Sequence, residues 1–484
     1  MFGCKVMQHH CQCLSDELSF VIPTYRLRDV GKTVEEYDQH FWQHGHSVRL
    51  MVFDDSAPAA QEKYYPFLEN TRTHQSVYYV GPREKDQLLN DLVDQLRDRR
   101  LETLVRNLFR PSYGGNRNFT LMYTLGGLMV SSDDDMRPFC LVEHRQEPLG
   151  DNEVSRGRLR EAGANGYTWK SFDLISAFLD VLGRAVSEVP ERYKRGELLV
   201  DTATDLVTNC SKGLVYENSL MLQAGAVPDT ARIKLAQTFR SGTNDVDAID
   251  FVNMMLDDEL QLNCDTLNNV YVLEDFRPVI TNQNWRMDCG VAAYDNTFGL
   301  PPFFPTQLRF EDYSYRLWAQ RDGIAAAHVD AAQNHCRSNY MRCSLAEEVL
   351  NEEVANLLKR KIKDTVTRLD ELSIDFDYDG TVTAHDVEHI VEKVAALHGR
   401  AVAIASVAWN PDRARALRRF AANLDKLFYG FVAESFDAPL ARIVDEAVRM
   451  IKGSIELWPN LIEIAFVQKR RSGLPCVYVN NHRK

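Results

Sequence analysis

The stretch Leu128-Met129-Val130-Ser131-Ser132-Asp133-Asp134-Asp135-Met136 joins an apolar run to three consecutive carboxylates. The apolar residues indicate a strand, and the aspartates stand where that strand ends. Three adjacent negative charges repel one another unless a cation or a network of donors neutralises them. Oxygen-rich clusters suit Mg²⁺ or Mn²⁺, and these ions bind diphosphates. A solvated turn after the strand is the competing interpretation.

Strand and helix signals alternate on the N-terminal side of this cluster. The expected strands are 18–23, 48–53, 76–80 and 128–130, and the expected helices are 29–44, one before residue 76, 85–109 and one that ends near residue 125. This alternation predicts an α/β fold with a largely parallel sheet. Ligands of such sheets bind at the carboxyl ends of the strands. Pro23-Thr24, Asp54-Asp55 and Asp133 all fall at those ends.

The composition is that of an ordinary globular protein. The 484 residues are 45% hydrophobic and 26% charged, with a net charge of −13. The acidic balance argues against nucleic acid as the main partner, because phosphate binding needs a basic face. No apolar run approaches the roughly 20 residues that span a bilayer. Ten cysteines without a framework spacing, and no standard secretion signal at the N-terminus, indicate reduced thiols and a cytoplasmic protein.

Four elements between residues 18 and 138 together resemble the donor-binding half of family 2 GT-A glycosyltransferases. They are Phe20-Val21-Ile22-Pro23-Thr24-Tyr25, Val52-Phe53-Asp54-Asp55-Ser56, Gly115-Asn116-Arg117-Asn118 and Asp133-Asp134-Asp135. The resemblance implies a Rossmann-like GT-A domain that binds a nucleotide sugar, with an acidic residue of the second element on the base. It implies donor-binding roles for Pro23, Thr24, Tyr25, Asp54, Asp55, Asn116, Arg117, Asp133 and Asp134. The last element resembles the DxD motif, in which Asp133 and Asp135 would hold Mn²⁺ or Mg²⁺.

The stretch Phe310-Glu311-Asp312-Tyr313-Ser314-Tyr315-Arg316-Leu317-Trp318 resembles the Glu-Asp motif of the same family. That motif opens a helix and contains the catalytic base. The resemblance implies Asp312 as the base, with Glu311 as the alternative base or a ligand of acceptor hydroxyls. Both acids can instead only favour a helix N-terminus through its dipole. In metal-dependent relatives a histidine further along is a third ligand, which implies His335, with His328 as its competitor.

Five segments are expected along the chain. They are a flexible tail at 1–14, the donor half at 15–143, a helical insertion at 144–270 that includes a helix from Trp169 to Val186, the acceptor half at 271–343 and a mostly helical domain at 344–484. Apolar residues in the last segment recur at three- and four-residue spacing. Such faces must be buried, either against the catalytic domain or in a homo-oligomer.

The chemistry of these residue types suits glycosyl transfer independently of the resemblance. Negative charge develops on the departing diphosphate, and a divalent ion held by carboxylates stabilises it. One carboxylate opposite the leaving group can deprotonate a carbohydrate or other hydroxyl acceptor, which predicts an inverting transferase of the hexosyltransferase class. A sugar nucleotidyltransferase is the rival enzyme, although its glycine-rich signature is missing. A calcium-responsive binding or regulatory protein on a transferase scaffold is the other alternative.

A second acidic motif occupies 375–386. Asp375, Asp377, Asp379 and Asp386 stand at positions 1, 3, 5 and 12 of a possible EF-hand Ca²⁺ loop, with Gly380 at position 6. Asp377-Tyr378-Asp379-Gly380-Thr381 also resembles the first motif of haloacid-dehalogenase-like phosphatases. The third interpretation is a plain turn followed by a capping box between Thr383 and Asp386.

Overall fold

The computed structural model describes the greater part of the chain. The described residues are 18–143, 158–161, 167–171, 173–189, 198–201, 206–209, 214–217, 230–243, 252, 270–274, 280–281, 290–305, 311–312, 315, 324–335, 348–355, 357, 382–432 and 437–479. The tail predicted at 1–14 and the first seven residues of the acidic motif at 375–386 lie outside these ranges.

The elements alternate between strand and helix in the N-terminal part of the chain. This part contains β1 (Ser19–Thr24), α1 (Leu27–His44), β2 (Arg49–Asp54), α2 (Pro58–Asn70), β3 (Ser76–Val80), α3 (Pro82–Leu96), η1 (Arg99–Leu101), α4 (Glu102–Leu108), α5 (Tyr113–Thr124), β4 (Leu128–Ser132), β5 (Met136–Arg137) and β6 (Phe139–Glu143). The middle part contains β7 (Arg158–Glu161), β8 (Tyr167–Ser171), α6 (Leu174–Leu179), η2 (Val186–Glu188), β9 (Leu198–Asp201), β10 (Leu206–Asn209), β11 (Leu214–Glu217), β12 (Ile233–Thr243), β13 (Val270–Glu274), β14 (Ile280–Thr281), β15 (Val291–Asp295) and β16 (Ala325–His335). The C-terminal part contains α10 (Ala384–Val407), α11 (Pro411–Val432), α12 (Asp437–Ser472) and β17 (Val477–Val479).

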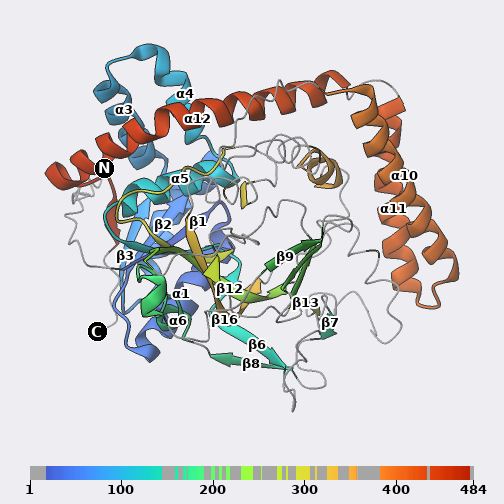
Figure 1. Cartoon of the computed structure of the whole chain (residues 1–484), viewed down its shortest axis with the longest axis horizontal. Helices are drawn as coiled ribbons and strands as arrows, with labels where there is room; N and C mark the ends of the chain where they lie inside the picture. Colours follow the sequence, from blue (N-terminus) through green and yellow to red (C-terminus); the bar gives the residue numbers. More distant parts are fainter. Residues whose placement is uncertain are drawn as a thin grey trace.

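A mixed sheet forms the centre of the molecule, with the strand order β14-β16-β12-β15-β4-β1-β2-β3-β17 (Figure 1). The strands β4, β1, β2 and β3 run parallel, and so do β12 and β16. The strand β15 is antiparallel to β4 and to β12, and so joins the two parallel groups. The predicted α/β fold is confirmed, because all four expected strands lie side by side in this sheet.

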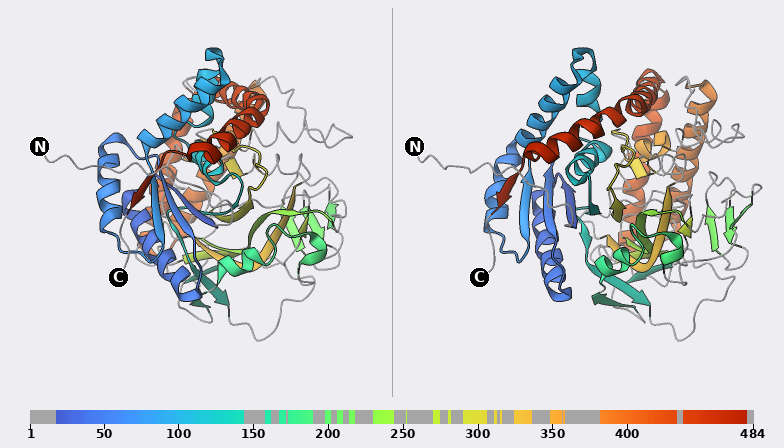
Figure 2. Two further views of the ribbon diagram at one scale, coloured as in Figure 1. Left: turned by 90° about the vertical axis from the view of Figure 1, so that its left-hand side faces the viewer. Right: turned by 60° about the vertical axis from the view of Figure 1, so that its left-hand side comes forward.

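Helices cover both faces of the parallel strands, as Figure 2 shows from two sides. Alternation along β1 sends Phe20 and Ile22 into one apolar core, where they meet Phe41 of α1. Val21 points into a second core on the other face, together with Leu88 of α3. Strands buried on both faces read as continuous apolar runs, which is why the sequence revealed them so clearly.

The single helix expected at 85–109 is wrong in its continuity. Helix α3 ends at Leu96, and the following residue, Arg97, adopts a left-handed conformation with φ of 56°. The side chain of Asp98 then accepts a hydrogen bond from the backbone N–H of Arg100 at 3.0 Å and starts η1, which leads into α4. A local cap therefore interrupts a sequence whose composition favours helix throughout.

The segment 144–270, expected to be a helical insertion, is mainly strand where the structure describes it. Residues 169–171, which were expected to begin a helix, belong to β8, and the helical residues described between 167 and 189 belong to α6 and η2. The strand β12 from the same segment lies within the central sheet, between β15 and β16. Strand preference depends on pairing partners, and those of β12 lie far along the chain, so a local pattern did not reveal it.

The helical C-terminal region is confirmed, and α12 packs along α3, α4 and α5 (Figures 1 and 2). The indole N–H of Trp458 donates to the carbonyl oxygen of Leu300 at 2.7 Å. The ammonium of Lys469 donates to the carbonyl oxygen of Leu125 at 2.5 Å. The strand β17, which was not expected, adds to the sheet edge at β3. Among the described helices, none is both long and apolar enough to cross a bilayer.

Candidate active site

The ends of β1, β2 and β4 bring the sequence-predicted polar residues to one edge of the sheet. Thr24 is paired with Asp54 in the parallel register of β1 and β2. The backbone N–H of Asp55 donates to the carbonyl oxygen of Thr24 at 2.8 Å. The strand β4 lies on the other side of β1 and leads directly into the three aspartates. The predicted convergence at the carboxyl ends of parallel strands is thus present.

The backbone of the acidic turn is held on both sides. The N–H of Asp133 donates to the carbonyl oxygen of Gly290 at 2.8 Å, and the N–H of Met136 donates back to Asp133 at 3.2 Å. Immediately after the turn, β5 pairs with the end of β16, so that Met136 stands opposite His335. This pairing brings the end of β16 next to the acidic turn.

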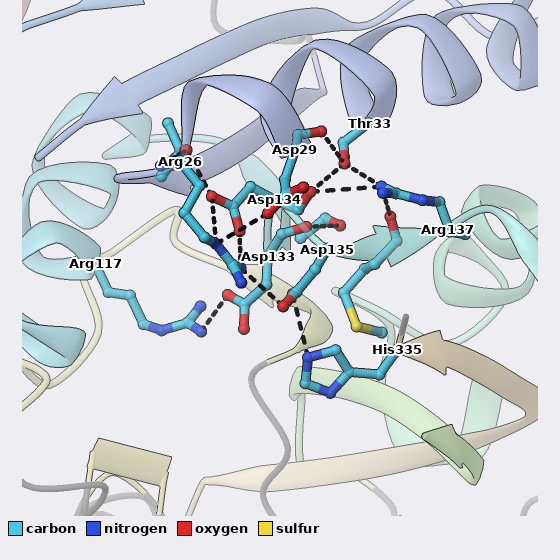
Figure 3. A network of polar contacts seen from close by, with 12 residues as sticks. Arg26, Asp29, Thr33, Arg117, Asp133, Asp134, Asp135, Arg137 and His335 are labelled. Carbon is cyan, nitrogen blue, oxygen red and sulfur yellow. Dashed lines mark hydrogen bonds and ion pairs between the residues drawn. The ribbon is translucent and has the colours of Figure 1, made fainter. Parts of the chain in front are cut away.

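Asp134 points back toward β1 and serves the structure of the turn. Its side chain is only 3% exposed. It accepts a hydrogen bond from the Thr24 hydroxyl at 2.6 Å and others from the guanidinium of Arg26. Its carbonyl oxygen accepts from the Thr33 hydroxyl and, at 3.4 Å, from Arg137 (Figure 3). The middle aspartate is therefore committed to protein partners.

Asp135 is paired with the histidine that the resemblance implied. Its Oδ1 lies 3.1 Å from Nε2 of His335, and its Oδ2 lies 2.8 Å from Nη2 of Arg26 (Figure 3). His328 also belongs to β16, where its backbone pairs with Gln237 of β12. Of the two candidate histidines, the structure brings His335 to the acidic turn.

Asp133 is the most accessible of the three aspartates. Its side chain is 25% exposed, and its Oδ1 lies 2.6 Å from Nη2 of Arg117. Burial raises the pKa of Asp133 to about 6, against the lowering effect of Arg117. Burial also raises the pKa of Asp134, against the charge of Arg26. Burial thus disfavours the charged form of both carboxylates, and the neighbouring arginines oppose that effect.

The element Gly115-Asn116-Arg117-Asn118 lies in the first two turns of α5. Ser112 caps this helix by accepting a hydrogen bond from the N–H of Gly115 at 3.0 Å. A Cβ atom on Gly114 would lie 2.1 Å from the carbonyl oxygen of Phe304, so glycine is required for this close approach. The amide of Asn118 exchanges two hydrogen bonds with the backbone of Phe303, at 2.7 and 2.8 Å. These contacts fix the helix that presents Arg117 to Asp133.

A buried lysine connects the second strand to this helix. The ammonium of Lys85 donates to Oδ1 of Asp55 at 2.5 Å and to Oδ1 of Asn116 at 2.8 Å. Asp54 is fully buried and accepts from the Tyr79 hydroxyl at 2.8 Å. Burial raises the pKa of Asp55 and lowers that of Lys85, while the attraction between them opposes both shifts. The ammonium of Lys85 also donates to the carbonyl oxygen of Asp54 at 2.8 Å, so it connects all three residues predicted to bind the nucleotide sugar here, Asp54, Asp55 and Asn116.

Packing connects the Glu-Asp motif to the same region. Glu311 and Asp312 are helical and half-buried. Tyr315, one helical turn after Asp312, is fully buried and stacks on Phe303 with ring centroids 4.0 Å apart. The guanidinium of Arg117 lies 5.8 Å from the centre of the Phe303 ring. A continuous chain of packed side chains therefore runs from the motif to Arg117, the partner of Asp133.

The remaining predicted site residues have separate positions. Pro23 is half-buried in β1, and the ring of Tyr25 is 52% exposed just after it. At the second acidic motif, Thr383 and Asp386 form the capping box of α10, with Oδ2 of Asp386 accepting from the Thr383 N–H at 2.9 Å. This cap agrees with the third interpretation of that motif. Asp375, Asp377 and Asp379 lie outside the described residues, so a Ca²⁺ loop there stays a prediction.

Two charged residues of the site escaped the sequence analysis. Arg26 follows the first family-like element directly, and a cation immediately after a strand end was the available signal. Lys85 stands in the first turns of α3 and carried no local signal, because its partners come from β2 and α5. Within the described ranges, no three acidic, histidine or cysteine side chains are gathered as a preformed metal site.

Comparison of the sequence with known protein families and with curated proteins gives no match. Comparison with solved structures gives the mannosyltransferase PcManGT from Pyrobaculum calidifontis, in complex with GDP-Man and Mn²⁺. The two chains are 12% identical, with a TM-score of 0.28, and the alignment covers 91% of this chain and 86% of the other. At a TM-score this low the likeness decides neither fold nor function, and both rest on the residues of this chain.

Proposed function

We propose that this chain is a divalent-metal-dependent, inverting glycosyltransferase that moves a sugar from a nucleotide sugar to a hydroxyl acceptor. The observation that carries the proposal is that the end of β16 brings His335 to within 3.1 Å of Asp135, in the turn after β4 that also contains Asp133. Arg117 stands beside it, and the Asp54–Asp55 pair ends the strand next to β1. In this proposal the diphosphate and the nucleobase of the donor would bind along the same edge of the sheet.

The donor set suits a hard divalent cation. It offers two carboxylates and an imidazole, which are ordinary ligands of Mn²⁺. Nε2 of His335 lies 3.1 Å from Oδ1 of Asp135, so one cation would be within reach of both side chains. When bound, the ion would neutralise charge on the departing diphosphate. Asp133, Asp135 and His335 would hold it.

The donor's other parts would meet residues that are already ordered. Arg117, fixed by α5 and placed over Phe303, can donate charge-assisted hydrogen bonds to a diphosphate oxygen. Asp55 and Asn116, both held by Lys85, would contact the nucleoside. Hydrogen-bond donors that are already in place need little further reorganisation when negative charge develops on the leaving group.

Asp312 is assigned as the general base. Its carboxylate accepts the proton of the acceptor hydroxyl while the oxygen forms a bond to the anomeric carbon. The bond between that carbon and the diphosphate oxygen breaks, and its electron pair leaves with the nucleoside diphosphate. Attack opposite the leaving group inverts the configuration. Glu311 is assigned to bind acceptor hydroxyls next to the base.

The test is a thermal-shift screen of the full chain with UDP, GDP, CDP and dTDP sugars, with and without Mn²⁺. A ligand at 100 times its dissociation constant stabilises the folded state by about 2.7 kcal/mol. We expect one nucleotide to raise the melting temperature only when Mn²⁺ is present, and Asp133→Asn to lose that increase. The matched control is Asp425→Asn on α11, which should keep it. No increase with any nucleotide sugar would contradict the proposal.

A further inference from the structure

Each of the two outer aspartates of the turn is engaged by its own arginine. Arg117 lies 2.6 Å from Asp133, and Arg26 lies 2.8 Å from Asp135 (Figure 3). Those carboxylates are the ones assigned above as metal ligands. The guanidinium groups of Arg26 and Arg117 therefore already provide positive charge next to the carboxylates that would bind the proposed cation.

The two arginines differ in how firmly they are held. Arg117 belongs to α5, has a side chain only 6% exposed and also donates to the Ser131 hydroxyl at 3.3 Å. Arg26 belongs to the short connection between β1 and α1, and its side chain is 23% exposed. Arg26 is therefore the arginine that can withdraw without unpacking a helix.

Arg26 also compensates more than one acid. Besides Asp135, its guanidinium contacts Asp134 and lies 3.5 Å from Asp29 (Figure 3). The side chains of Asp134 and Asp135 are only 3% and 2% exposed. Two buried neighbouring carboxylates are costly without a cation, so Arg26 stabilises the turn in the protein alone. Burial would lower the pKa of Arg26, yet these two carboxylates raise it above its usual value.

We propose that Arg26 is a built-in counter-ion that competes with the divalent cation for Asp135. Metal binding then requires the guanidinium to leave Asp135, and the released charge becomes available to the donor diphosphate. This inference rests on the function proposed above. It makes metal and nucleotide binding mutually dependent, because the diphosphate offers Arg26 a replacement partner.

If Arg26 competes with the cation, removing its guanidinium should strengthen Mn²⁺ binding, whereas removing a metal ligand would weaken it. Loss of the guanidinium leaves Asp135 unpaired and removes a repelling charge, so Mn²⁺ alone should bind more tightly. We expect Arg26→Gln to lower the dissociation constant of Mn²⁺ at least tenfold. The enhancement of Mn²⁺ binding by the nucleoside diphosphate should shrink in the same variant, since the replacement contact is lost.

The experiment is isothermal titration of the full chain with MnCl₂, with and without the nucleoside diphosphate that the screen identifies. The matched control is Arg28→Gln, which removes the same charge from an exposed position two residues away. It should stay within about twofold of the wild type. Circular dichroism checks that each variant is folded. If Arg26→Gln unfolds, the same titration is made with the double variant Arg26→Gln, Asp134→Asn, which also removes the charge of a buried acid.

The outcomes separate this inference from the proposed function. Tighter Mn²⁺ binding by Arg26→Gln but not by Arg28→Gln supports the competition. Equal or weaker binding by Arg26→Gln overturns it, while Mn²⁺ binding by the wild type keeps the proposed metal site intact. If neither the wild type nor Arg26→Gln binds Mn²⁺, with or without nucleotide, the metal-dependent function itself is wrong and the inference falls with it.

Discussion

Nε2 of His335 lies 3.1 Å from Oδ1 of Asp135, although the two residues are far apart in the sequence. The pairing of β5 with β16 produces this approach, because it sets His335 opposite Met136, the residue after Asp135. The geometry of one short antiparallel pair thus decides which histidine can serve the acidic turn.

His335→Gln should weaken Mn²⁺ binding in the presence of the nucleoside diphosphate by at least about 10-fold, because His335 is assigned as a ligand and loss of a ligand's hydrogen-bond partner alone costs about 10- to 100-fold. The measurement is isothermal titration with MnCl₂. His398→Gln on α10, whose side chain is 34% exposed, is the control and should bind like the wild type. Equal affinities for the two variants would remove His335 from the site.

Asp312→Asn should reduce transfer by at least a thousandfold and leave nucleotide affinity within a few-fold, because deprotonation and donor binding use different residues. Steady-state kinetics and nucleotide titration of the same preparation separate the two effects. Glu311→Gln should raise the KM for the acceptor more than it lowers kcat. A larger loss of kcat in Glu311→Gln than in Asp312→Asn would exchange their roles.

Gly114→Ala should destabilise the protein by about 1–3 kcal/mol, because its Cβ would collide with backbone. The collision is with the carbonyl oxygen of Phe304, at 2.1 Å. Gly399→Ala is the matched control, since nothing lies within 4 Å of its Cβ position on helix α10. It should stabilise the helix by about 0.5–1 kcal/mol. Urea unfolding measures both, and equal effects would show that α5 does not need its glycine.

Stability should fall between pH 7 and pH 5 because of His40. Burial lowers the pKa of this histidine to about 4, His44 lowers it further and Asp173 partly opposes them. The unfolded chain, with a pKa near 6.5, binds more protons in this range, so protonation favours unfolding by about 2 kcal/mol at pH 5 relative to pH 7. In urea unfolding, the free energy of unfolding of His40→Leu should fall by about 2 kcal/mol less than that of the wild type between pH 7 and pH 5. An unchanged pH dependence would show that another group is responsible.

The N-terminal half of the fold was readable from the sequence because its strands are buried on both faces. The strand expected at 76–80 matches β3 residue for residue, and those expected at 18–23 and 48–53 begin and end one residue before β1 and β2. Those strand ends also located most of the candidate site. The end of each strand can be recognised from the local sequence, and the parallel topology places these ends together at one edge of the sheet.

Long-range partners explain what the sequence did not reveal. The strand β17 is only three residues long and becomes a strand by pairing with β3. The strand β12 lies in the sheet between β15 and β16, although its own segment is polar and mixed. The sequence around Lys85 is typical of a lysine on a helix surface, but in the structure its ammonium is buried against Asp55, which follows β2, and Asn116 of α5. In each case the deciding contact comes from a residue that no local pattern includes.

The most direct test of the metal–diphosphate site is release of nucleoside diphosphate from the nucleotide sugar that the thermal-shift screen identifies. The wild type and Asp135→Asn are assayed in EDTA and again after Mn²⁺ is restored. We expect the wild type to be inactive in EDTA and active with Mn²⁺, and Asp135→Asn to be inactive in both. Full activity of the wild type in EDTA, or of Asp135→Asn with Mn²⁺, would contradict the site.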